Sequence, residues 1–82
     1  MSSSVDWKKT KYQEVFEEEL RFLARRRQYD PGCTVKDIEG VLRNLYIMEG
    51  ADGYGRGELQ DLIMGARIAA YEHFLAEWKL VK

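Results

Sequence analysis

The residues best suited to chemistry are one histidine and two glutamates. His73 and Glu77 are four residues apart, so on a helix their side chains lie on the same face, one turn from each other. Glu19 lies at a similar depth in an earlier helical stretch, and two parallel helices would bring it to His73. A carboxylate beside an imidazole favours the charged histidine and fixes its ring orientation. This cluster predicts either an acid/base pair or a polar contact that fixes helix register.

The same cluster is a poor metal site. A helical di-metal centre requires a glutamate three residues before the histidine, and that position is Ala70. His73 is the only histidine in the chain, which leaves a thin set of ligands. We therefore predict no cofactor at this position, and Glu19, His73 and Glu77 stay candidates for catalysis only.

Two short acidic pairs are the second set of candidates. Glu14 and Glu17 are three residues apart, and so are Glu58 and Asp61. Magnesium prefers carboxylates near phosphate groups. The pairs resemble the acidic motifs with which all-α nucleotide pyrophosphohydrolases of the MazG type hold magnesium. That resemblance covers eight positions and implies a magnesium-dependent nucleotide hydrolase, which is the alternative to the function favoured below.

The composition indicates one small helical domain. The chain has 82 residues, 45% of them hydrophobic and 33% charged, a balance typical of globular proteins. The single proline, Pro31, and the scarcity of Thr and Val favour helices. After a flexible N-terminus at residues 1–5, we expect one domain at 6–82 with helices at about 6–28, 35–49 and 58–80.

Local signals mark how these helices begin and end. Residues 29–32 form a turn around Pro31, and Thr34 with Asp37 is a capping box that starts the second helix at Val35. Cys33 lies in this turn, where we expect Cys33→Ser to leave stability unchanged. Residues 50–57 form a glycine-rich loop that fits neither a calcium loop nor a phosphate loop, and the role of Tyr54 within it stays open.

Each of the first two helices has one inner face. The inner residues of the first are Tyr12, Phe16, Leu20 and Leu23. Those of the second are Ile38, Val41, Leu42, Leu45 and Met48, with Ile47 on the outside. Because short connections make successive helices antiparallel, we predict an all-α, three-helix up-down-up bundle with long, shorter and long helices.

The third helix has two apolar rows and a narrow polar strip. The first row, to be buried against the other helices, contains Leu59, Leu62, Ile63, Ala66, Ala70 and Phe74. The second row contains Met64, Ile68, Tyr71 and Leu75, and the polar strip, left for water, contains Asp61, Gly65, Glu72 and Lys79. A single bundle would leave the second row exposed, and such a row normally marks an interface. We therefore predict a protein-interaction module without catalytic activity that forms a homodimer through this row and that can also bind another protein.

The net charge and the absence of targeting signals limit which other functions and cellular locations we expect. The net charge is −1, and the basic residues of the first helix fall in two separated clusters, so nucleic-acid binding is only a second alternative. The sequence has no signal peptide and no apolar run long enough for a membrane, and its one cysteine makes no internal disulfide. These observations predict a cytoplasmic protein without a membrane partner.

Overall fold

The computed structural model describes residues 4–51 and 57–80 and contains three α-helices. They are α1 (Ser4–Tyr29), α2 (Val35–Ala51) and α3 (Glu58–Leu80). The described residues contain no strand, which confirms the all-α class. Of the segment predicted to be flexible, residues 1–3 lie outside the described residues, and Ser4 and Val5 belong to α1.

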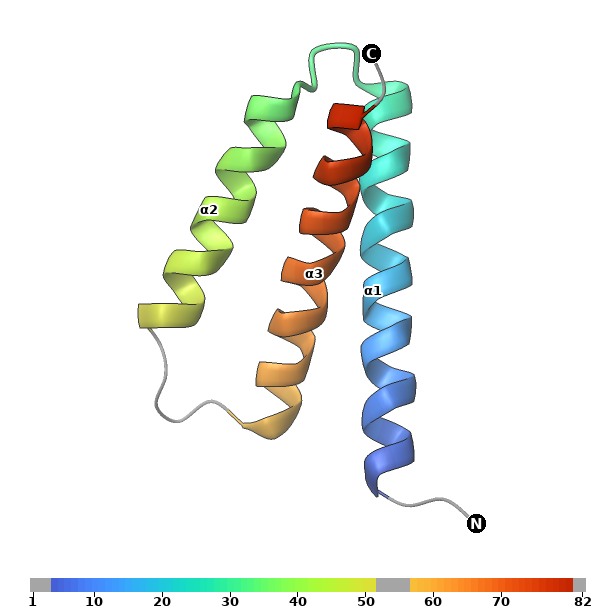
Figure 1. Cartoon of the computed structure of the whole chain (residues 1–82), viewed down its shortest axis with the longest axis vertical. Coiled ribbons are helices and arrows are strands. Elements are labelled where there is room, and N and C mark those ends of the chain that lie inside the picture. The colour runs from blue at the N-terminus through green and yellow to red at the C-terminus, as the bar shows by residue number, and fades with distance from the viewer. Residues whose placement is uncertain (1–3, 52–56, 81–82) are drawn as a thin grey trace.

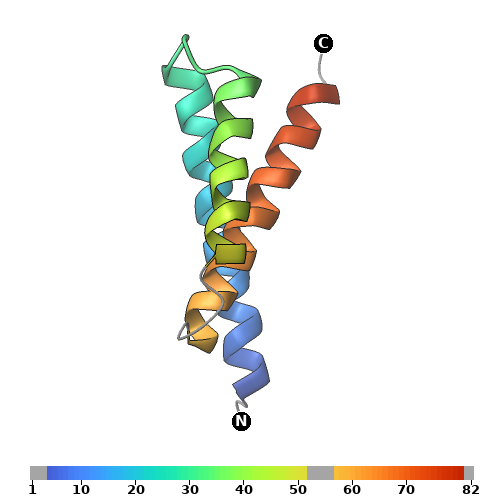
Figure 2. The same cartoon turned by 90° about the vertical axis from the view of Figure 1, so that its left-hand side faces the viewer.

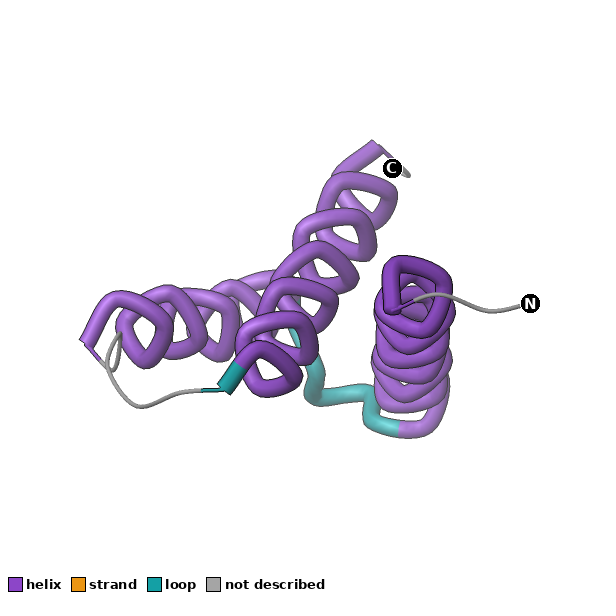
Figure 3. Tube along the Cα trace, turned by 90° about the horizontal axis from the view of Figure 1, so that it is seen from below, coloured by secondary structure: helices purple, strands orange, loops and turns teal. Residues whose placement is uncertain are grey.

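The helices run up, down and up, as predicted, so α1 and α3 are parallel (Figure 1). Their arrangement is nevertheless more open than a compact bundle. Helix α3 is central and packs against both α1 and α2, whereas α1 and α2 do not pack along each other. Figure 3 shows α3 between the other two helices, and Figure 2 shows its C-terminal end leaning away from them.

The turn between α1 and α2 is fixed by hydrogen bonds from its own backbone and side chains. The Asp30 carboxylate accepts a bond from the Gly32 amide at 3.1 Å, and the Cys33 amide donates to the Asp30 carbonyl at 2.9 Å. The predicted capping box is confirmed. The Asp37 amide donates to the Thr34 hydroxyl at 3.3 Å, and the Thr34 amide donates to the Asp37 carboxylate at 3.0 Å. Helix α2 accordingly begins at Val35.

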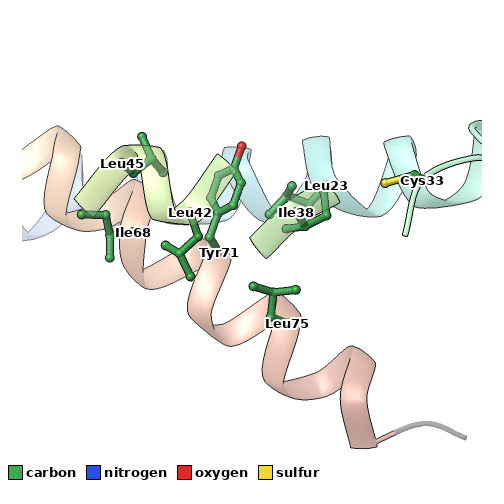
Figure 4. Packing of buried hydrophobic residues seen from close by; sticks show 8 residues of the cluster. All are labelled: Leu23, Cys33, Ile38, Leu42, Leu45, Ile68, Tyr71 and Leu75. Carbon is green, nitrogen blue, oxygen red and sulfur yellow. The ribbon is translucent and has the colours of Figure 1, made fainter. Parts of the chain in front are cut away.

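The core lies where side chains of all three helices meet beside this turn. Figure 4 shows Tyr71 of α3 among residues of α1 and α2. Leu23 and Ile38 are completely buried there. The members of this cluster are Leu23, Cys33, Ile38, Leu42, Leu45, Ile68, Tyr71 and Leu75. Burial of each large apolar side chain stabilises the fold by about 1.5–3 kcal/mol.

The residues predicted to face inward on α1 and α2 are buried or half-buried near this core, but those far from it are exposed. Phe16 and Leu20 are half-buried, but Tyr12 is 40% exposed and Met48 is 52% exposed. Tyr12 lies in the first half of α1 and Met48 in the last turn of α2, so both are far along their helices from the turn that joins them. Ile47 is 59% exposed, as its position on the outside of α2 predicts.

The burial of Cys33 overturns the expectation for its replacement. The thiol is part of the core cluster and only 9% exposed. We now expect Cys33→Ser to lower the free energy of unfolding by about 1–3 kcal/mol, because the new hydroxyl would be buried without a designed partner. Urea denaturation followed by circular dichroism measures the change. Cys33→Ala is the matched control and should cost less; equal stability of the serine variant and the wild type would contradict the burial of this side chain.

Candidate functional site

Glu19 meets Arg67 of α3 instead of His73. The Glu19 carboxylate lies 3.6 Å from the Arg67 Nε, and the two side chains are 23% and 37% exposed. This distance makes an ion pair but no hydrogen bond, and the buried Arg67 Nε has no hydrogen-bond partner among the described atoms. The long arginine thus occupies the position that the sequence analysis gave to the histidine.

His73 makes only local contacts with polar groups. Its Nε2 lies 3.5 Å from the carboxylate of Glu77, the residue one turn later on α3, and the two side chains are 49% and 68% exposed. Its ring lies 5.9 Å from that of Phe16 on α1. In the described structure, Glu19 therefore pairs with Arg67 and His73 with Glu77, so the predicted three-residue cluster does not form.

The acidic pairs lie on different surfaces. Glu14 and Glu17 are exposed on α1, where Glu17 accepts a hydrogen bond from Gln13 at 2.9 Å. On α3, Glu58 forms an ion pair with Lys8, and Asp61 is exposed. In the described residues, no three histidine, cysteine or acidic side chains lie close enough to hold a metal ion.

The prediction that the second apolar row of α3 faces water is wrong. Ile68, Tyr71 and Leu75 are buried in the core, with exposed fractions of 8%, 3% and 4%, and Met64 packs against them. The physical reason is the central place of α3. One side of this helix packs on α1 and another on α2, so both apolar rows find partners within the chain.

The polar strip of α3 lies beside α2. The Tyr46 hydroxyl donates a hydrogen bond to the Glu72 carboxylate, and this bond raises the pKa of Tyr46 above its ordinary value. Lys79 pairs with Glu39 at 2.6 Å, and the hydrogen bond from Lys79 lowers the pKa of Glu39. Both contacts were missed because the sequence gives no register between two separate helices.

Two of the basic residues of α1 are also used within the chain. Lys8 pairs with Glu58, and the guanidinium of Arg27 lies 4.3 Å from the centre of the Trp78 ring. Trp78 in turn packs edge-on against Phe74, with ring centroids 5.5 Å apart. The contacts of Lys8 and Arg27 join α1 to α3 near the opposite ends of their interface.

An open groove lies between the first halves of α1 and α3. Its volume is about 560 Å³, within the range of ligand and interaction pockets. Four of the lining residues come from α1 and one from α3: Lys8, Lys9, Tyr12, Gln13 and Leu62. Nearby, Leu59 at the start of α3 is 43% exposed. The predicted glycine-rich loop with Tyr54 lies mostly outside the described residues, so its role stays a prediction.

Comparisons with protein families, curated proteins and solved structures found no match to this chain. The resemblance of the acidic pairs to the MazG type therefore gains no support from a family model. In the described segments, none of the three helices has the length and apolar character needed to span a membrane.

Because Ile68 is part of the core, we expect Ile68→Glu to unfold the chain rather than to separate subunits. An unpaired carboxylate there should cost more than about 3 kcal/mol, which is a large share of the stability of so small a protein. Circular dichroism and thermal melting measure the loss of helix. The control is Ile47→Glu on the exposed side of α2, which should change stability by less than about 0.5 kcal/mol. A folded Ile68→Glu variant with wild-type stability would restore the earlier prediction of an exposed row.

Tyr71 makes the stability sensitive to alkaline pH. Burial raises the pKa of Tyr71, the negative charge of Glu19 adds to the rise, and the Arg67 cation opposes it. The neutral phenol is therefore favoured in the folded state. Its contribution is complete below the ordinary tyrosine pKa of about 10 and is lost as the pH rises through the higher folded pKa.

We expect the free energy of unfolding of Tyr71→Phe to fall less steeply above about pH 10 than that of the wild type. Urea denaturation at a series of pH values measures both slopes. Some loss should remain, because the pKa of Tyr46 is raised as well. The matched control is Tyr29→Phe, at a position that is 73% exposed, which should keep the wild-type slope. The idea fails if Tyr71→Phe and the wild type lose stability in parallel.

Proposed function

We propose that this chain is a small helical protein-interaction module whose first partner is another copy of itself. The observation that carries the proposal is its large accessible surface. The chain of 9.6 kDa has 6052 Å² of accessible surface. A folded monomer of that mass is expected to have about 5,100 Å². The excess, roughly 950 Å², is comparable to the ~800 Å² that each partner buries in a stable interface of standard size.

The dimensions of the molecule support the same proposal. Its radius of gyration is 14.3 Å. A compact domain of this length would have a radius of gyration of roughly 12 Å, and one of twice the length roughly 15 Å. The open arrangement follows from the central place of α3, which separates α1 from α2. A second copy could cover the surface that this separation leaves accessible.

Exposed apolar side chains give the surface its driving force. Several large hydrophobic residues are more than 40% exposed although they lie on helices that pack inward on other sides. They include Trp7, Phe22, Tyr46, Met48 and Leu59. Isolated exposed apolar residues are ordinary on a monomer, but a chain this short gains much from added core. Self-association would supply that core without any further segment.

Analytical ultracentrifugation of the purified chain tests the proposal. We expect a concentration-dependent equilibrium between monomer and dimer, with the melting temperature rising as the protein concentration increases, because association stabilises the folded state by mass action. A single monomeric species with a concentration-independent melting temperature, up to the limit of solubility, would overturn the proposal.

A further inference from the structure

The groove between α1 and α3 brings apolar side chains and charges together around a hollow. Tyr12 and Leu62 line it from opposite helices. Tyr12 is still 40% exposed, although it belongs to the inner face of α1. The Lys8–Glu58 ion pair joins α1 to α3 near the groove, whereas Tyr12 and Leu62, its apolar floor, stay accessible. Something outside the described residues must cover this floor if it is to be buried.

The apolar residues at the end of α2 make a weaker surface. Tyr46, Ile47 and Met48 are all exposed, but they are consecutive in the sequence. Successive residues of a helix point in directions about 100° apart, so these three side chains do not share a face. Tyr46 is also engaged by Glu72 of the same chain. The groove is therefore the better candidate for a continuous interface.

The two helices that flank the groove carry opposite charges near it. Lys8 and Lys9 line the groove on the α1 wall. On the α3 wall the lining residue is Leu62, and Glu58 and Asp61 lie beside it in the first turn of α3. Lys8 and Glu58 stand at the same level, since they pair with each other. If a second copy is turned about a two-fold axis that runs along the groove, its α1 wall lies over the α3 wall of the first copy. Lysines then face acidic residues at both walls, and a perpendicular axis would instead place α1 on α1.

We propose that this groove is the contact surface of a two-fold homodimer with parallel subunits. This inference rests on the self-association proposed above. The Tyr12 and Leu62 side chains of both copies form the shared apolar centre. Lys9 of each copy pairs with Glu58 of the other at the rim. A groove with lysines on its α1 wall and acidic residues beside its α3 wall matches a second copy of itself better than a uniformly charged partner, because complementary charges fix the orientation of association.

Sedimentation equilibrium of single variants tests the place of the interface. We expect Tyr12→Glu to raise the dimer dissociation constant at least about 100-fold, because it puts two carboxylates into the apolar centre. Ile47→Glu on the outer side of α2 is the matched control and should leave the constant unchanged. Circular dichroism confirms that each variant keeps the helix content of the wild type.

A charge swap tests the orientation without touching the apolar centre. Lys9→Glu should weaken the dimer on the order of 10-fold. The triple variant Lys8→Glu, Lys9→Glu and Glu58→Lys keeps the pair between positions 8 and 58 with its signs reversed and should regain most of the wild-type affinity. The charge swap also tests the place of the interface if Tyr12→Glu does not fold. Swapped charges that fail to restore the affinity would overturn the parallel two-fold arrangement.

The outcomes separate this inference from the proposed function. A wild-type chain that stays monomeric overturns self-association and with it the second copy as occupant of the groove, leaving a different partner chain to cover it. A wild-type dimer that Tyr12→Glu does not weaken overturns the groove alone. Loss of dimerisation in Ile47→Glu would instead move the interface to α2.

Discussion

The structure depends on one constraint, which is that α3 must bury apolar side chains on two of its sides. The described residues contain two other helices, and both sides of α3 are covered when α1 takes one and α2 takes the other. This arrangement buries Ala66 and Ala70 as well as Ile68 and Leu75. Its consequence is that α1 and α2 share a core only beside their connecting turn, where Leu23 and the neighbouring residues of α2 meet around Tyr71.

A central helix with separate neighbours leaves much surface in water. A compact three-helix bundle buries one common core along its whole length, whereas here the buried cluster runs from Cys33 at the turn to Leu45 and Ile68 near the middle of their helices, and α1 contributes one residue to it, Leu23. Small domains already bury a low fraction of their surface, so a further loss of shared core reduces a narrow margin of stability. The open end of the α1–α3 interface is thus the part of the molecule with most to gain from a partner.

Local features were predictable from the sequence because their causes are local. The capping box of Thr34 and Asp37, the turn at Pro31 and the outward position of Ile47 depend on residues within one or two turns. The helices that cover each row of α3 were not predictable, because periodicity gives the faces of a helix but not the partner of each face. The proposed Glu19–His73 contact failed for a related reason. Glu19 and His73 were expected at the same height along two parallel helices, but the long side chain of Arg67 pairs with the Glu19 carboxylate instead.

Polar contacts fix the register that the apolar rows leave undetermined. On the α1 side, ion pairs at Lys8 and Glu19 and the cation–π contact of Arg27 mark the start, middle and end of the interface. Each exposed contact of this kind stabilises the fold by only about 0–1 kcal/mol, but a helix shifted by one turn would lose all of them together. The groove walls are therefore held at a set spacing before any partner arrives. A preorganised surface loses less conformational entropy on association, so even a modest apolar centre at Tyr12 and Leu62 can contribute to affinity.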